Sequence, residues 1–176
     1  MTIIEESGMR FGEFSDARVF PIENSSLHLS FGGGIKTVEF LLLSGRDRLI
    51  FLEAKTTCPN AANKDETAEK NRKFKEYYSD ITDKFIDSFQ MLLTTVLKRH
   101  SLTNEIGTEI KEKDDYSKTT FYFILVIRNA PSEEWLAGPK AELESRLFRY
   151  QKIWKIRVLV LNESLAKEHG LIVKAS

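Results

Sequence analysis

The most specific feature of this chain is the stretch IKTVEFLLLSGRDRLIFLEAK, residues 35–55. Two apolar runs, at residues 38–43 and 49–55, flank a short polar stretch that contains Gly45. Side chains on a strand alternate between its two faces, and glycine among polar residues between two apolar runs is typical of a β-hairpin. The stretch therefore predicts two antiparallel strands joined by a tight turn.

Two carboxylates and an amine lie at the open end of this hairpin. The period of two places Glu53 and Lys55 on one face of the second strand. A three-residue loop from Gly45 to Asp47 would place Glu39 opposite Glu53, with their Cβ atoms about 4.5–5.5 Å apart. A loop of two or four residues would turn Glu39 to the wrong face. The site hypothesis therefore predicts a register as well as a hairpin.

Two carboxylates at this separation repel each other unless a cation offsets their charge. Mg²⁺ prefers oxygen ligands and is often held by one or two carboxylates, and Mn²⁺ is the alternative. Lys55 would activate a water or stabilise negative charge on a substrate. The competing interpretation is a solvated ion pair, since a second Glu-x-Lys occurs at residues 109–111 in a polar stretch. The apolar flanks and Glu39 favour a site.

This arrangement resembles the PD-(D/E)xK nuclease-like superfamily, also called restriction-endonuclease-like. That family places an acidic residue on one core strand and Asp/Glu-x-Lys on the next strand of a hairpin. Glu53-Ala54-Lys55 matches the second element, and Glu39 occupies the position of the first. The first acid is Glu where the family has Asp, and Val38 stands where it has Pro. The resemblance implies catalytic roles for Glu39, Glu53 and Lys55, with Glu39 and Glu53 as metal ligands.

Family members often carry a further acid upstream, for which Glu23 is the best candidate and a third metal ligand. Some carry a glutamine on the following helix, where Gln90 could serve. The resemblance covers most of the chain and implies a Mg²⁺- or Mn²⁺-dependent nuclease that hydrolyses phosphodiester bonds, with DNA favoured over RNA as the nucleic acid. Because some members have lost catalysis, a catalytically silent binding or assembly module is the alternative.

Length and composition predict one domain over residues 1–176. A hydrophobic content of 41% with 12 Phe can supply a core. The chain has no apolar run of transmembrane length, and its N-terminus lacks the regions of a signal peptide. Cys58 is the only cysteine, so an internal disulfide is excluded and a reducing, cytoplasmic location is expected. We interpret Cys58 as structural, and we assign no role to the three scattered histidines.

The charge balance limits the nucleic-acid partner. Lys+Arg and Asp+Glu both number 26, which argues against tight, non-specific binding to long duplexes. Two local basic groups could approach phosphates, although solvated helix faces are the simpler interpretation for each. A homodimer or a partner protein could supply the missing basic surface. The groups are Lys70, Arg72, Lys73 and Lys75, and Arg146, Arg149, Lys152, Lys155 and Arg157.

The remaining pattern predicts a mixed sheet between helices, a three-layer α/β/α sandwich with a restriction-endonuclease-like core. Residues 1–16 are expected to form a short helix or a loosely ordered arm, and residues 25–31 are ambiguous. Asp83, Asp87 and Gln90 share a helix face that we expect to meet water rather than the hairpin. The other expected elements are an edge strand at 17–23, a loop at 60–73, a helix from 74 to about 100, a loop at 101–118, an interior strand at 121–127, a helix within 131–154 that starts near 138, a strand at 156–161 and a capped helix at 162–169.

Overall fold

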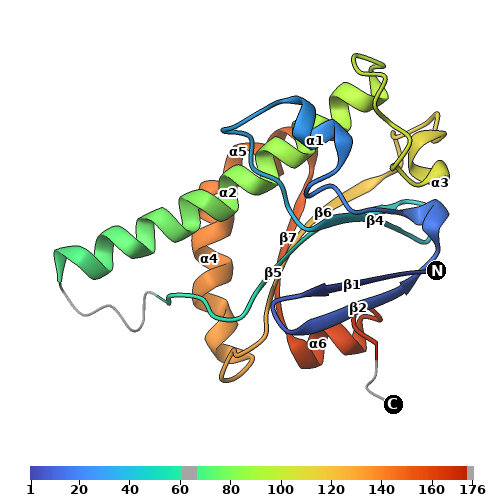
Figure 1. Cartoon of the computed structure of the whole chain (residues 1–176). Helices are drawn as coiled ribbons and strands as arrows, with labels where there is room; N and C mark the ends of the chain where they lie inside the picture. The colour runs from blue at the N-terminus through green and yellow to red at the C-terminus, as the bar shows by residue number, and fades with distance from the viewer. Residues whose placement is uncertain (61–66, 174–176) are drawn as a thin grey trace.

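The computed structural model describes residues 1–60 and 67–173, and it has a mixed α/β architecture (Figure 1). Five strands form a mixed sheet in the order β3-β4-β5-β6-β7, and two further strands, β1 and β2, form a separate hairpin. The elements are β1 (Thr2–Glu6), β2 (Met9–Phe14), β3 (Val19–Phe20), α1 (Ser26–Ser30), β4 (Phe40–Ser44), β5 (Arg48–Lys55), α2 (Ala68–Val96), α3 (Thr108–Lys111), β6 (Thr120–Ile127), α4 (Ala137–Arg146), α5 (Phe148–Trp154), β7 (Arg157–Asn162) and α6 (Glu163–Glu168).

The predicted hairpin is present as β4 and β5, with the predicted register. Ser44 pairs with Arg48 and Phe40 with Leu52, so the loop has three residues, and Gly45 has a φ of 68°. That left-handed conformation carries no steric penalty for glycine. The regular ladder ends at Phe40, and the Glu39 amide donates to the Leu52 carbonyl at 3.0 Å. Glu39 therefore lies directly before the first residue of β4 rather than inside the strand.

The second half of the sheet is parallel. β6 pairs with β5 and with β7 in parallel, and helices connect these strands. The apolar run at 121–127 is buried at almost every position, as expected for a strand covered on both faces. The predicted interior strand is thus confirmed, although the middle position in the sheet belongs to β5.

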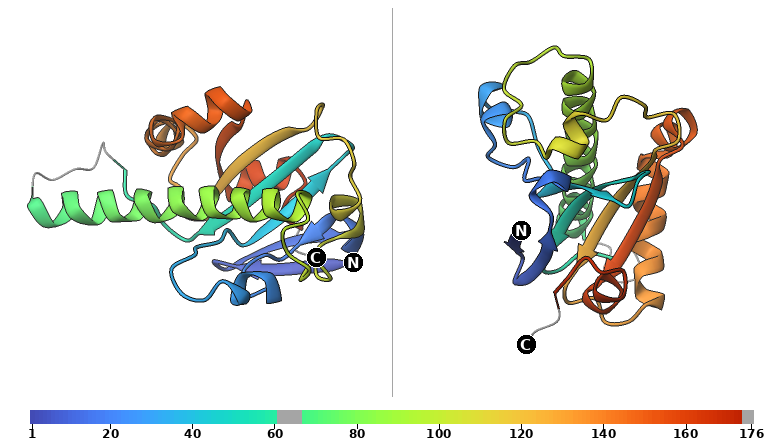
Figure 2. Two further views of the ribbon diagram at one scale, coloured as in Figure 1. Left: turned by 90° about the horizontal axis from the view of Figure 1, so that it is seen from above. Right: turned by 90° about the vertical axis from the view of Figure 1, so that its right-hand side faces the viewer.

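Helix α2 covers one face of the sheet with the predicted aromatic stripe. Phe74, Tyr78, Ile81, Phe85 and Phe89 are buried, and the Thr67 hydroxyl accepts from the amide three residues later to cap the helix. The helix begins at Ala68, earlier than expected, and ends at Val96. Its N-terminal part extends beyond the sheet (Figure 2). Part of the predicted loop at 60–73, residues 61–66, lies outside the described residues.

The predicted helix within 131–154 is two helices. α4 starts at Ala137, close to the expected start, and α5 follows after a bend at Leu147. Leu143 and Leu147 are both fully buried, and the Gln151 side-chain amide donates to the Glu144 carbonyl across the bend at 2.9 Å. Together α2 and α4 cover the same face of the sheet, in one apolar cluster with the side chains of β5 and β6.

The opposite face is covered by the β1–β2 hairpin and by α6 (Figure 1). The expectation of a helix or a loose arm at residues 1–16 is therefore wrong. Met9 and Phe11 point inward, and the rings of Phe11 and Phe40 lie 5.6 Å apart. The turn consists of Ser7 and Gly8, both with positive φ, which is the geometry that favours a two-residue hairpin loop. The Ser-Gly pair between alternating residues was the local signal for this element.

Two short helices complete the chain. α1 occupies the ambiguous stretch before the Gly-rich segment, and α3 lies in the polar stretch that we expected to be a loop.

The last helix, α6, is capped as predicted, since the Asn162 side chain accepts from the Leu165 amide and Gly170 has a φ of 70°. Within residues 1–60 and 67–173, no helix is sufficiently long and hydrophobic to cross a bilayer.

Candidate functional site

The candidate residues gather at the carboxyl end of β5. Glu53 and Lys55 lie on one face of β5, as the strand period predicted, and the structure shows that this face packs against α2. The side chain of Glu53 has no exposed surface, and that of Lys55 is 28% exposed. Glu39, directly before β4, is also buried. A buried carboxylate is costly unless it is paired, so the contacts of these side chains determine what the site can do.

Glu53 is held by two lysines. Its Oε1 accepts from Lys55 Nζ at 2.7 Å and from Lys84 Nζ at 2.8 Å. Lys84 comes from α2 and lies 4.0 Å from Glu39 Oε1, so one ammonium group faces both carboxylates. The second oxygen, Glu53 Oε2, is buried and has no hydrogen-bond partner. The site therefore retains an acceptor that the protein itself does not satisfy.

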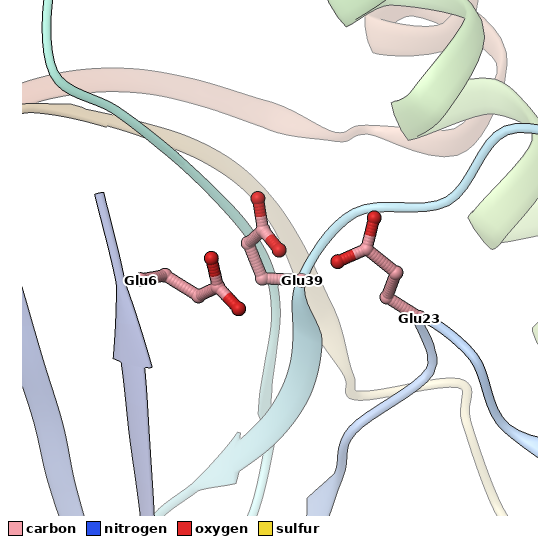
Figure 3. A group of neighbouring side chains, drawn as sticks. All are labelled: Glu6, Glu23 and Glu39. Carbon is pink, nitrogen blue, oxygen red and sulfur yellow. The ribbon is translucent and has the colours of Figure 1, made fainter.

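Glu39 also belongs to a second group of carboxylates. Glu6, Glu23 and Glu39 each place one oxygen within 4.8 Å of the others, and Figure 3 shows the three side chains converging. Glu6 comes from the end of β1, and Glu23 from the turn after β3. The Ser7 hydroxyl donates to the Ala54 carbonyl at 3.0 Å, which attaches the β1–β2 turn to β5 and brings Glu6 to the site.

Burial and mutual repulsion shift the protonation of these acids. Burial, the charge of Glu53 and a hydrogen bond with Glu23 raise the pKa of Glu39 to about 9. Burial also raises the pKa of Glu53, although Lys84 and Lys55 act in the opposite direction. The pKa of Glu6 is raised by burial and by its acidic neighbours. Without a cation, the cluster holds protons that free carboxyl groups would release.

The pKa of Lys84, the cationic partner of these acids, is shifted in the direction that keeps the side chain charged. Burial acts to lower the pKa of Lys84, but the carboxylates of Glu53 and Glu39 outweigh it and raise that pKa. Lys84 thus remains an ammonium while it is only 14% exposed. A positive charge fixed beside two acids can stabilise negative charge that develops on a bound group.

Sequence reasoning missed two residues of this site, Lys84 and Glu6. Lys84 lies three residues after Ile81 and four before Ser88, both buried, so helical spacing places it at the edge of the buried stripe. A lysine at such a position requires a partner, and that was the available signal. Glu6 had no comparable signal, because its place in the site depends on how the β1–β2 hairpin packs.

The other candidates lie elsewhere. Gln90 is exposed, as expected. Asp83 and Asp87 do not only meet water: Asp83 accepts from Lys36 Nζ and Asp87 from the Lys36 amide, both at 3.0 Å. These two bonds attach the segment before β4 to α2, so the acids position the hairpin indirectly.

Cys58 fits the structural interpretation. Its Sγ lies 3.1 Å from the Tyr78 hydroxyl, and burial raises the pKa of the thiol. A thiol with a raised pKa is a poor nucleophile at neutral pH. Cys58 therefore contributes packing beside the candidate site rather than reactivity.

Comparison of this chain with protein-family models, with curated proteins and with solved structures finds no match in any of the three.

Proposed function

We propose that this chain is a divalent-metal-dependent nuclease of the PD-(D/E)xK type, with Glu39, Glu53 and Lys55 as its catalytic residues. One observation carries the proposal: Glu53 is wholly buried beside Glu39 and keeps Oε2 without a partner, while Lys55 Nζ contacts its other oxygen. The odd loop that this arrangement requires is the loop between β4 and β5. The five-stranded mixed sheet with helices is compatible with the nuclease-like core.

The donor set suits a hard cation. Mg²⁺ and Mn²⁺ are bound through carboxylate oxygens, and this end of the sheet offers four carboxylates and an unsatisfied buried oxygen. Glu39, Glu53 and Glu23 would hold the cation, and Glu6 extends the predicted set. When bound, such an ion neutralises charge on a phosphate and lowers the pKa of a coordinated water.

The residues of the chain have separate tasks in this proposal. Lys55, the more exposed lysine, would orient the attacking water and donate to a phosphate oxygen. Lys84 would keep Glu53 ionised and in place, because it contacts the same oxygen from the opposite element. Burial keeps Glu53 away from bulk water, where its interactions would be weaker.

The second candidate is a catalytically silent binding or assembly module. It is favoured by the double ion pair on Glu53, since two lysines already neutralise the buried carboxylate without any metal. In that case the buried carboxylates and their two lysines only stabilise the fold. The two candidates differ in whether divalent cations bind at all.

One set of measurements separates them. Purified protein is incubated with supercoiled and single-stranded DNA in MgCl₂ or MnCl₂, and its thermal midpoint is measured with and without each salt. We expect cleavage and a cation-dependent rise in midpoint, with Glu53→Gln and Lys55→Met lowering the cleavage rate by about a hundredfold. Glu168→Gln, an exposed acid on α6, is the matched control and should leave the rate unchanged.

The proposal fails if cleavage persists unchanged in Glu53→Gln and Lys55→Met. If neither cation moves the midpoint and no DNA is cut, the chain is the silent module.

A further inference from the structure

A hollow of about 290 Å³ lies on the sheet face opposite α2 and apart from the carboxylates. Its floor consists of apolar side chains from β5, β6 and β7, Ile50, Ile124 and Leu159, together with the ring of Tyr122. Glu53 lies at the other end of β5 and on its other face. The hollow is therefore separate from the candidate nuclease site.

The hollow exists because the cover of this face is incomplete. The β1–β2 hairpin and α6 pack over the later parts of the strands, where Leu52, Ala54 and Val126 are buried beneath them. Leu171, which follows α6, forms one wall where the chain turns to bond with β2. The part of the face around Ile50, Tyr122 and Leu159 is left as the hollow.

The rim of the hollow is positive. Arg48 and Arg157 line it, and neither forms an ion pair or a side-chain hydrogen bond with any residue in the described part of the chain. Arg157 only approaches the Tyr122 ring, at 5.9 Å. Among residues 1–60 and 67–173, no Asp or Glu lines the hollow. In a chain with no net charge, this is a local concentration of unneutralised cations.

The sheet register brings the two arginines toward one ligand. Arg157 pairs with Tyr122, which pairs with Ile50, and Arg48 is two residues before Ile50 on the same face. β5 and β7 are two strand spacings apart, about 10 Å, and the two-residue offset adds about 7 Å along the strand, so the backbones of the two arginines lie about 12 Å apart. Two long side chains at this separation can approach a single anion from opposite sides.

We propose that this hollow binds a mononucleotide, with its phosphate between Arg48 and Arg157 and its base on the apolar floor. A phosphate monoester carries a charge of about −1.5 to −2 at neutral pH, which matches two guanidinium groups. Arginine also binds phosphate through two parallel hydrogen bonds. The apolar floor with its aromatic ring suits a base, and the volume is at the small end for ligand pockets. This proposal does not depend on the nuclease proposal.

Ser44 and His169 complete the rim. Their side chains line the hollow and make no hydrogen bond with another described side chain or backbone group. Both side chains can donate hydrogen bonds to a ribose hydroxyl or to a phosphate oxygen. An apolar anion without hydroxyl groups has fewer acceptors for these donors. The rim chemistry thus favours a phosphorylated, hydroxyl-bearing ligand over a simple aromatic acid.

The test is calorimetric titration with adenosine 5′-monophosphate in buffer containing EDTA. EDTA removes divalent cations, so the carboxylate cluster cannot hold the phosphate through a metal. We expect saturable binding that weakens about tenfold or more in Arg48→Ala and in Arg157→Ala. Arg99→Ala, an exposed arginine beyond the end of α2, is the matched control and should bind as the unmodified protein does. Adenosine and inorganic phosphate should each bind at least about tenfold more weakly than the nucleotide.

Methyl NMR locates the binding independently of any variant. The Ile124 signal should move on titration, whereas that of Ile81, buried under α2 on the other face, should not. The proposal is overturned if the nucleotide does not bind at millimolar concentration, if both arginine variants bind it normally, or if inorganic phosphate binds as tightly. Movement of Ile81 without Ile124 would also overturn it.

Discussion

At the scale of single residues, the protein depends on the pairing of Glu53 with Lys84. Both side chains are largely removed from water, and they meet at 2.8 Å. Breaking a buried pair by removing one partner leaves an uncompensated charge, which costs about 3–5 kcal/mol. In this site Lys55 Nζ still contacts the same oxygen at 2.7 Å after Lys84 is replaced, so Glu53 keeps one partner. We therefore expect Lys84→Met to lower the free energy of unfolding at pH 7 by about 1.5–3 kcal/mol, measured by urea denaturation.

The matched control for this prediction lies on the same helix. Lys73 pairs with Glu69 at 2.7 Å, but both side chains are about two-thirds exposed. Lys73→Met should therefore cost no more than about 0.5 kcal/mol. Adding Glu53→Gln to Lys84→Met should recover part of the loss, because the unpaired charge is then removed. Equal costs for Lys84→Met and Lys73→Met would contradict the buried pairing.

Glu39 predicts a dependence of stability on pH. Its folded pKa of about 9 lies above the ordinary value of 4.5, so the folded protein keeps this proton where the unfolded chain has released it. The contribution of Glu39 to stability therefore declines as the pH rises from about 4.5 to about 9. Glutamine cannot ionise and avoids this loss. In metal-free buffer at pH 8, we expect Glu39→Gln to be more stable than the unmodified protein by about 1–3 kcal/mol.

Denaturation curves from pH 5 to pH 9, with EDTA present, measure this difference. The gap between the two proteins should widen as the pH increases. Parallel curves would show that folding does not raise the pKa of Glu39.

At the scale of elements, the β1–β2 hairpin is an integral part of the core. Phe11 is completely buried against Phe40. Truncating a buried phenylalanine costs about 3–5 kcal/mol through lost transfer energy and the cavity that remains. We expect Phe11→Ala to lower the free energy of unfolding by this amount in urea denaturation. Ile3→Ala, at a position on β1 that is 37% exposed, should cost less than about 1 kcal/mol.

A loosely ordered N-terminal arm would give a different result. In that case Phe11→Ala and Ile3→Ala would have similar, small effects. The hairpin also carries Glu6 to the carboxylate cluster, so its stability and the geometry of the candidate site are linked.

At the scale of the whole molecule, the two basic groups differ in how they are neutralised. Arg72 and Lys73 on α2 pair with glutamates one turn away. In the second group Arg146 pairs with Glu142, but Arg149, Lys152 and Lys155 form no ion pair within the described part of the chain. Unpaired cations can be attracted to phosphates without first losing a partner.

If the chain binds nucleic acid as proposed, its salt dependence should reflect this difference. We expect glutamine at positions 149, 152 and 155 to weaken single-stranded DNA binding in EDTA and to reduce the salt slope by about 1–2. Glutamine at positions 72 and 73 should change the slope by less. Fluorescence anisotropy over a range of NaCl concentrations measures both. Identical slopes in all three proteins would place the nucleic acid elsewhere.

Much of this fold was predictable because its signals are local. The turn at Gly45, the alternation in β5 and the helical spacing in α2 each depend on neighbouring residues, and each was predicted with the correct type and face. The register of β4 on β5 follows from the three-residue loop, a length that the sequence left open. The β1–β2 hairpin was missed, because its strands are short and the alternation of apolar and polar residues is broken where the register shifts between Thr2 and Ile4.

The alternation of side chains along β5 was enough to predict that Glu53 and Lys55 share a face. The position of Glu39 depended on the length of the turn at Gly45, which the sequence left open and the structure shows to be three residues. Only the tertiary structure decided that Lys84 would contact Glu53, that Glu6 and Glu23 would join Glu39, and that a positive hollow would remain open on the other face. These facts depend on where α2, the N-terminal hairpin and α6 pack on the sheet. That packing is set by apolar burial over the whole molecule, which no local pattern encodes.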